Sequence, residues 1–193
     1  MADGGIAMAG PAVETARLVL RPVEFGDAGT TVELMTPGLV HYLLSWSSPM
    51  TAADAQARIL ASRAAMHERR AIDFAVLRKA DGVLIGWVGL KLTNLTEARA
   101  RLGFWIGEPF QGCGYMSEAV GPALRAGASW LGAAIVEAGA THDNAASLAI
   151  LRRLGMIQGE GSSVRLPSRG GAAVECHNFS LALQPPLTSS RIS

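Results

Sequence analysis

The chain has 193 residues, of which 49% are hydrophobic, and a formal net charge of +1 at pH 7. This length predicts one domain, and so high a hydrophobic fraction excludes a disordered chain. The charge balance, without any long basic stretch, gives no support to nucleic-acid binding, and no apolar run approaches the roughly 18 residues that a membrane span needs.

Two terminal segments are predicted to be flexible tails. Residues 1–14 are small and rich in glycine and alanine, and residues 185–193 are rich in proline and serine. The first segment also lacks the basic region of a secretory signal peptide, so we expect a cytoplasmic protein. Residues 15–184 then form the predicted single domain.

The first part of this domain predicts one strand and then helices. The stretch "ARLVLRP" alternates leucines with charged residues, which indicates a strand that ends at Pro22. A short helix is expected from about Asp27. Thr51 can then cap a longer helix, with Asp54 in its first turn, and apolar residues recur at helical spacing to about Arg69.

The middle of the chain predicts an antiparallel meander. Three strand-like segments follow one another: "DFAVLR", "GVLIGWVGLKL" and "ARARLGFWIG". The turn signal Asp81-Gly82 separates the first two. So little sequence lies between the segments that no crossover helix can join them, and antiparallel pairing is expected.

The last part predicts alternating helices and strands. A helix is expected from about Ser117 to Leu131, followed by the buried strand "AAIVEAGA". A second helix begins at Asn144 and stops at Gly155. Two further strands are expected near Met156–Val164 and Val174–Leu183. The whole order predicts an α+β fold in which helices cover a mixed sheet.

The stretch "FQGCGYMSEA", Phe110 to Ala119, joins a predicted strand to a predicted helix and contains two glycines. The first N–H groups of a helix have no intrahelical acceptor and lie at the positive end of its dipole. Gly112 and Gly114 remove side chains that would keep an anion away from these groups. The turn therefore suits a phosphate or pyrophosphate, although a plain glycine-rich turn also fits the sequence.

Other phosphate-binding motifs match this turn less well. A Walker A loop requires a lysine, which is absent here. A dinucleotide fingerprint requires a third glycine where Ser117 stands, and it opens a βαβ unit instead of following a meander. Glu137, at the distance of a ribose-binding acid, falls inside its strand. Dinucleotide binding is therefore the weaker alternative.

The segments "FWIGEPFQGCGYMSEA" and "NAASLAILRRLGM" resemble the GNAT superfamily of N-acetyltransferases. Gln111 and Gly114 match its Q-x-x-G-x-G/A motif, and Asn144 and Ser147 match its N-x-x-S helix start. The resemblance, which covers roughly residues 14–184, is strongest to the branch that acetylates protein N-termini, including those of ribosomal proteins. It implies a GNAT-like mixed, mostly antiparallel sheet of about seven strands covered by about four helices.

The resemblance also implies acetyl-CoA as the acetyl donor. In the family, N–H groups of the glycine turn hold the CoA pyrophosphate. By match, these groups belong to Gln111, Gly112, Cys113, Gly114, Tyr115, Met116 and Ser117. The preceding strand splays from its neighbour and pairs with the pantetheine arm, and one of its N–H groups can polarise the thioester carbonyl. Its residues here are Phe104, Trp105 and Ile106.

Two further residues bear on the donor site. The family's helix-start asparagine reaches the pantetheine, which implies that role for Asn144. Met116 departs from the motif, whose last position is usually glycine or alanine. Its long side chain must point away from the pyrophosphate, or it narrows the site.

The implied reaction is a direct attack of a neutral amine on a thioester. The family often uses a tyrosine of the Asn144 helix as the acid that protonates the CoA sulfur, but Ser147 is the only hydroxyl there. The resemblance therefore implies Ser147 as this acid. Simpler roles stay open, because Asn144 can be a plain helix cap and Ser147 can bond locally.

No general base is evident from the sequence. The candidates are Glu108, Glu160, Glu175, His142 and His177. A protein α-amine has a pKa of about 7.7–8.0, whereas a lysine amine has one near 10.4, so far more of the α-amine is neutral near pH 7. A site without a strong base therefore favours an α-amine as acceptor.

The sequence thus predicts an acetyl-CoA-dependent N-acetyltransferase that acts on a primary amine, with a protein or peptide N-terminus favoured. Acetylation of a small-molecule amine and a non-catalytic CoA-binding module remain alternatives. No metal site is expected, because the two cysteines and four histidines form no ligand motif. Many relatives form dimers, so the resemblance allows a homodimer.

Overall fold

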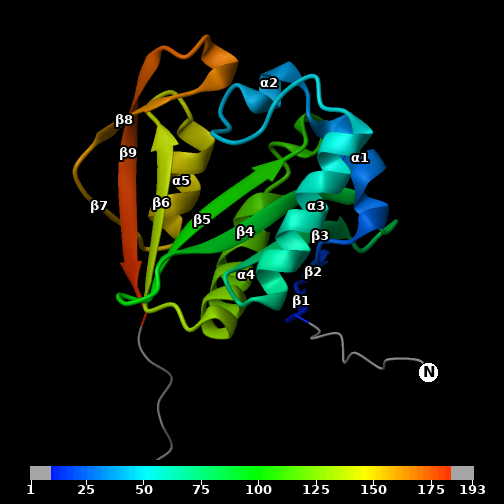
Figure 1. Ribbon diagram of the computed structural model, residues 1–193, viewed down its shortest axis with the longest axis horizontal. Coiled ribbons are helices and arrows are strands. Elements are labelled where there is room, and N and C mark those ends of the chain that lie inside the picture. Colours follow the sequence, from blue (N-terminus) through cyan, green and yellow to red (C-terminus); the bar gives the residue numbers. More distant parts are fainter. Residues whose placement is uncertain (1–9, 184–193) are drawn as a thin grey trace, which may run out of the picture.

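The computed structural model describes residues 10–183 (Figure 1). Most of the two predicted tails, residues 1–9 and 185–193, lies outside these residues, so the division into tails and domain stays a prediction. Within the segment 1–14, Val13–Glu14 forms a short strand that pairs with the next strand along the chain.

One sheet of nine strands runs through the described part of the chain. The strands are β1 (Val13–Glu14), β2 (Leu18–Pro22), β3 (Ala71–Arg78), β4 (Leu84–Asn94), β5 (Arg99–Ile106), β6 (Ile135–Thr141), β7 (Ile157–Gln158), β8 (Ser162–Arg165) and β9 (Ala173–Ala182). Their order is β1-β2-β3-β4-β5-β6-β9-β7, and β8 also pairs with β9. Only β5 and β6 pair in parallel, so the predicted mixed, mostly antiparallel sheet is confirmed.

Helices cover both faces of this sheet (Figure 1). The α-helices are α1 (Ala28–Leu34), α2 (Pro37–Val40), α3 (Ala52–His67), α4 (Tyr115–Leu131) and α5 (Ala145–Arg153). Three short 3-10 turns, η1 (Phe25–Asp27), η2 (Glu108–Phe110) and η3 (Pro167–Arg169), complete the elements. None of the helices within residues 10–183 is both long and apolar enough to span a bilayer.

Alternating side chains divide the interior into two hydrophobic cores. In β4, Val88 packs in the core beneath α4 and α5, whereas its neighbour Trp87 packs in the core beneath α1, α2 and α3. Successive strand residues point to opposite faces, so α1–α3 lie on one face of the sheet and α4 and α5 on the other. Burying each large apolar side chain contributes about 1.5–3 kcal/mol to stability.

The predicted start of the long helix is confirmed. The Thr51 hydroxyl oxygen accepts the Asp54 N–H at 3.1 Å, and the Asp54 carboxylate accepts the Thr51 N–H at 2.9 Å. These two bonds form a capping box, which satisfies two N–H groups that would otherwise lack partners. The helix α3 that follows buries Ala55, Ile59 and Ser62 against the sheet.

The structure corrects the prediction at three places. The single strand predicted near Met156–Val164 is two strands, β7 and β8, because a Gly-Glu-Gly segment breaks the extended run after Gln158. Helix α4 begins at Tyr115, two residues before the predicted Ser117, because Gly114 already forms its N-cap. The short helix α2 was missed from the sequence, and Thr36 caps it.

The titratable side chain of Asp73 is half-buried beneath α3. Asp73 of β3 lies against Gly89 of β4, where any added Cβ would collide with its carboxylate. Burial raises the pKa of the Asp73 carboxyl, and the nearby Ser62, Arg58 and Lys91 lower it only in part. The folded protein therefore binds this proton more tightly than the unfolded chain, and stability is lost as pH rises from about 4 through the folded pKa.

Replacing this carboxyl tests that account. Asp73→Asn keeps the shape and a hydrogen-bond acceptor but removes the titration, so the variant should have the higher melting temperature at about pH 7 and match the wild type near pH 4. Thermal melts monitored by circular dichroism across this range measure the difference. A constant offset between the two proteins at every pH would contradict the account.

Candidate active site

The sheet splits between β5 and β6. The two strands pair only at their beginnings, where Arg99, Ala100 and Arg101 face Ile135, Val136 and Glu137. Beyond Arg101 no further pairs join them, although β5 continues to Ile106 and β6 to Thr141. The splay predicted for Phe104–Ile106 is therefore present, and one edge of β5 is open along these residues.

The backbone of β5 presents polar groups to this opening. Gly107 N–H donates to the Ile85 carbonyl of β4 at 2.9 Å. Because hydrogen-bonding direction alternates along a strand, the N–H groups of Phe104 and Ile106 face away from β4 and toward the split. The Ile106 carbonyl faces the same way and accepts a hydrogen bond from the Gln111 side chain at 3.2 Å.

The glycine turn places a helix N-terminus at the end of the same strand. Gly112 and Gly114 have φ angles of 73° and 76°, in the left-handed region that favours glycine. Helix α4 then opens with the N–H groups of Tyr115, Met116 and Ser117, which by position have no acceptor within the helix. The turn and helix start therefore form an anion-attracting surface beside the open edge of β5.

An ion pair with the start of β2 fixes this helix start. Arg17 donates to the Glu118 carboxylate through its backbone N–H at 2.8 Å and its Nε at 2.7 Å. The Arg17 guanidinium also donates to the Cys113 carbonyl at 3.0 Å. Burial alone would raise the pKa of Glu118, but hydrogen bonds from Thr15 and Arg17 lower it below its usual value. The glycine turn is thus tied to a distant strand through its backbone.

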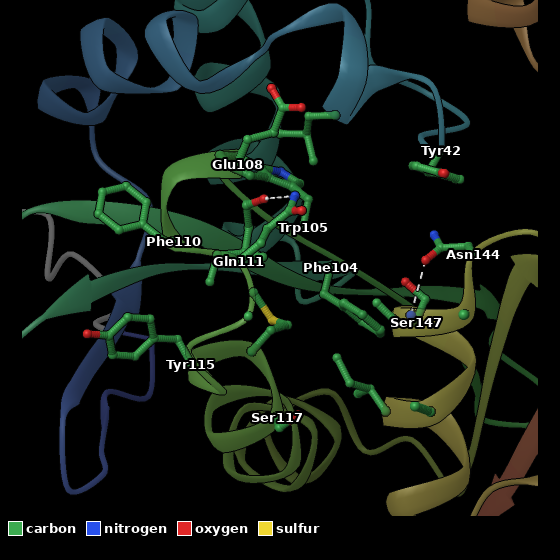
Figure 2. A pocket seen from close by; sticks show the side chains of 18 of the residues that line it. Tyr42, Phe104, Trp105, Glu108, Phe110, Gln111, Tyr115, Ser117, Asn144 and Ser147 are labelled. Carbon is green, nitrogen blue, oxygen red and sulfur yellow. Dashed lines mark hydrogen bonds between the residues drawn. The ribbon is translucent and has the colours of Figure 1, made fainter.

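A cavity of about 640 Å³ lies over the split (Figure 2). Its walls come from the end of β5, the glycine turn, the start of α4, helix α5 and the segment around α2. Every predicted site residue except Cys113 lines it: Phe104, Trp105, Ile106, Gln111, Gly112, Gly114, Tyr115, Met116, Ser117, Asn144 and Ser147. Cys113 is exposed and lies outside the cavity lining.

The structure shows how Met116 fits at a motif position that is usually glycine or alanine. Its side chain is only 5% exposed and packs in the core beneath α4. Gly86 of β4 makes room for it, because a Cβ there would approach the Met116 Cε to 3.3 Å. The long side chain therefore points into the core and leaves the helix N-terminus accessible.

Asn144 and Ser147 lie on the opposite wall of the cavity, with Ser147 facing Phe104 (Figure 2). The Asn144 carboxamide oxygen accepts the Ser147 backbone N–H at 3.1 Å, so Asn144 is a helix cap. This bond uses the oxygen and leaves the Asn144 Nδ2 group available to a ligand. The Ser147 hydroxyl is half-buried at the cavity wall.

The sequence missed several lining residues. Arg153 lines the cavity at the end of α5, and its position continues the three-residue spacing of Asn144, Ser147 and Ile150 along one helix face. That spacing is the signal that could have found it. Tyr42, Leu43 and Gly38 from the α2 region carry no recognisable motif and were not predictable.

The five candidates for the general base lie in different parts of the molecule. Only Glu108 lines the cavity, and its carboxylate accepts a hydrogen bond from the Thr36 hydroxyl. His142 and His177 stack on each other elsewhere, with ring centroids 3.9 Å apart. Glu160 and Glu175 do not contribute to the cavity wall. In the described part of the chain, no group of three His, Cys, Asp or Glu side chains could hold a metal ion.

Arg169 joins three loops at the outer end of the cavity. Its guanidinium forms an ion pair with Asp143, 2.9 Å away, and donates to the His41 carbonyl at 3.0 Å. It also lies over the Tyr42 ring, with 5.4 Å between the guanidinium carbon and the ring centroid. These contacts hold η3, the segment after α2 and the loop before α5 together, near α2 in Figure 1.

A second cavity of about 420 Å³ lies along β6. Arg101, Glu137 and Thr141 contribute to its lining, together with residues of β8 and β9. Tyr42 lines both cavities.

The open split, the helix N-terminus beside it and the cavity over both are the features by which the N-acetyltransferase fold is recognised. The chain belongs to the GNAT acetyltransferase family, because the family model described as "Acetyltransferase (GNAT) domain" matches residues 17–157. Family membership makes the protein an acyltransferase and weakens the alternative of a non-catalytic module. A dinucleotide-binding sheet is also excluded, since only one strand pair is parallel.

Individual relatives agree with this assignment. The chain is 26% identical over 167 residues to "Uncharacterized N-acetyltransferase p20" of Bacillus licheniformis, covering 86% of this chain and 93% of that protein. Its fold is similar to the ribosomal-protein-S5-alanine acetyltransferase of Vibrio fischeri, with a TM-score of 0.79, 19% identity, and coverage of 89% and 96% of the two chains. It is also similar to RimL, a ribosomal L7/L12 alpha-N-protein acetyltransferase in complex with coenzyme A, with a TM-score of 0.77, 15% identity, and coverage of 90% and 98%.

The left-handed turn provides a test by substitution. Gly114→Ala places a Cβ on a residue with φ of 76°, which should lower the free energy of unfolding by about 1–2 kcal/mol. Gly29→Ala is the matched control, because Gly29 lies in α1 with open space around it and no positive φ. Urea unfolding measures the free energy of unfolding of both variants. Equal stability of the two variants would contradict a left-handed turn at Gly114.

Proposed function

We propose that the protein is an acetyl-CoA-dependent N-acetyltransferase that transfers the acetyl group directly to a primary amine, in particular the N-terminal α-amine of a protein or peptide. The observation that carries the proposal is the cavity that joins the start of α4 to the open edge of β5. Phosphate groups can bind at the start of α4. An extended arm that contains amides can pair with the open edge of β5.

Named groups of the chain would hold the donor. The N–H groups of Tyr115, Met116 and Ser117 would bind the pyrophosphate, and the open edge at Phe104–Ile106 would pair with the pantetheine amides. Arg153 adds a positive charge on the same cavity that can meet a further phosphate of CoA. The solved relatives that contain coenzyme A or acetyl-CoA support this donor.

The same edge would assist the chemistry. A backbone N–H of β5, from Phe104 or Ile106, would donate to the thioester carbonyl oxygen as negative charge develops there. Ser147, on the facing wall, would donate its hydroxyl proton to the departing CoA sulfur and take up a proton from water. A thiol with a pKa near 8.5 is already a tolerable leaving group, so this acid assists the reaction without being indispensable.

Glu108 would act on the acceptor side. It is the one sequence candidate for the base that lines the cavity, and the Thr36 hydroxyl holds its carboxylate there. Its charge would attract the ammonium form of the amine and take up the proton that must leave before attack. A single weak carboxylate base favours an α-amine, whose pKa of about 7.7–8.0 lies well below that of lysine.

Thiol release tests the proposed function directly. The protein is incubated with acetyl-CoA and a panel of peptides with free N-termini, N-blocked lysine peptides and small amines. Turnover is expected with the free N-termini and should be weak with the lysine peptides. Binding of acetyl-CoA without turnover of any amine would overturn the proposal. Turnover confined to small amines would show that the acceptor is a small molecule and not a peptide N-terminus.

Ser147 gives the second test. Ser147→Ala should lower kcat by roughly tenfold while acetyl-CoA affinity, measured by calorimetry, stays unchanged. Ser129→Ala, an exposed position on α4 outside the cavity, is the control. An unchanged kcat would remove Ser147 from the reaction.

Glu108 gives the third test. Glu108→Gln should lower kcat/KM about 10- to 100-fold near pH 7, and the deficit should shrink as pH rises above the amine pKa of about 8, where the amine is already neutral. Glu160→Gln, outside the cavity, serves as control. A deficit that is independent of pH would show that Glu108 positions the acceptor without taking its proton.

A further inference from the structure

Arg169, the last residue of η3, contacts two distant parts of the chain at once. Its Nη1 and Nη2 lie 2.9 Å and 3.2 Å from the two carboxylate oxygens of Asp143, which makes the ion pair bidentate. Its Nε donates to the carbonyl of His41, 128 residues away in the sequence. Only 15% of the Arg169 side chain is exposed. These charge-assisted bonds are therefore partly shielded from water, which makes them stronger than the same bonds at an open surface.

The turn that carries Arg169 is itself anchored. Leu166, just before η3, is 2% exposed, and its carbonyl accepts the Arg169 N–H at 2.9 Å. On either side of the turn, β8 pairs with β9 along its whole length. The guanidinium of Arg169 is thus held at the end of a paired hairpin, where it provides a fixed point for the two loops that it contacts.

The two parts that Arg169 joins belong to different walls of the 640 Å³ cavity. Asp143 directly precedes Asn144, the cap of α5, and both residues line the cavity. His41 belongs to residues 36–43, which we call the α2 segment. Four residues of this segment line the same cavity: Gly38, Leu39, Tyr42 and Leu43. Arg169 therefore fixes how the wall at the start of α5 lies relative to the wall formed by the α2 segment.

The other end of the α2 segment contacts the proposed base. Thr36, the N-cap of α2, donates its hydroxyl to the Glu108 carboxylate and accepts the Leu39 N–H at 3.2 Å. Glu108 also lies so close to Gly38 that an added Cβ there would overlap its carboxylate. The α2 segment is thus held by Glu108 at one end and by Arg169 at the other.

The α2 segment lies where the acceptor would bind. The donor would occupy the start of α4 and the edge of β5, whereas Leu39 and Val40 pack beneath α1–α3, on the other face of the sheet from α4. A molecule that reaches Glu108 lies against this segment, because Gly38 contacts Glu108 directly. Tyr42, beneath the Arg169 guanidinium, is still 41% exposed, so its ring can also contact a ligand (Figure 2).

We propose that Arg169 is a positioning residue for the peptide acceptor, because it holds the α2 segment against the loop before α5 and so forms the acceptor wall of the site. This rests on the proposed function. Arg169 itself lines neither of the two cavities, so it acts through the segment that it holds. Lysine cannot replace it, since one ammonium group cannot make the planar bidentate pair with Asp143 and also bond to the His41 carbonyl in the same geometry.

The test measures Arg169→Gln with a peptide acceptor and with a small primary amine. KM for the peptide should rise about three- to tenfold. KM for the small amine should change less, because it contacts less of the α2 segment. The Kd of acetyl-CoA, measured by calorimetry, should stay within about twofold, because the donor would bind at α4 and β5. Arg169→Lys should keep most of the defect in peptide KM.

Arg165→Gln is the matched control. Arg165 is an exposed arginine of the same hairpin, and its guanidinium donates to the Gly171 carbonyl at 2.8 Å, within the hairpin. It lines neither cavity. This variant should leave the peptide KM, the small-amine KM and the acetyl-CoA Kd unchanged.

A double-mutant cycle tests whether the ion pair is the link. Asp143→Asn should raise the peptide KM in the same direction as Arg169→Gln. The double variant should be no worse than the more impaired single variant, because both changes break one interaction. Effects that multiply in the double variant would overturn the inference that Arg169 acts through Asp143.

The ways in which the inference can fail are distinguishable. An unchanged peptide KM in Arg169→Gln, or equal rises in peptide KM, small-amine KM and acetyl-CoA Kd, would overturn the positioning role and leave the acetyltransferase proposal intact. If Arg169→Gln does not fold, as judged by circular dichroism, Arg169→Lys and Asp143→Asn provide the same test. Wild-type protein that turns over no peptide would overturn the peptide acceptor itself, and with it this inference.

Discussion

The open edge of β5 is the constraint on which the rest of the structure depends. An unpaired strand edge inside a sheet leaves N–H and C=O groups without partners, and such groups are costly unless something else satisfies them. Here β5 and β6 pair over three residues and then separate. The pairing anchors the two strands, and the separation exposes the Phe104 and Ile106 N–H groups where a ligand strand can replace the missing neighbour.

Neighbouring elements are arranged to keep this edge usable. The Arg17–Glu118 ion pair holds the glycine turn and the start of α4 beside it. Met116 turns into the core, which leaves the helix N-terminus accessible. Arg169 ties three loops together at the far end. In the function we propose, the donor binds along this edge and the acceptor amine reaches the thioester there.

Much of this was predictable from the sequence, because the features concerned are local. Alternating residues indicated the meander, Thr51 and Asp54 the helix cap, and two glycines the anion-attracting turn. The short helix α2 and the division into β7 and β8 could not be predicted from the sequence. Elements of two to four residues are set by tertiary contacts and show no periodicity. Glu108 could be named only as one of five candidates, since only the fold brings it to the cavity.

Amide hydrogen exchange with and without acetyl-CoA tests the central claim most directly. If the open edge of β5 and the start of α4 bind the donor, acetyl-CoA should slow exchange at the Phe104 and Ile106 amides and at those of Tyr115 to Ser117. The amides of β3, already paired within the sheet, should not change. Saturating acetyl-CoA that leaves the Phe104 and Ile106 amides unprotected, while the protein turns over an amine, would contradict the account.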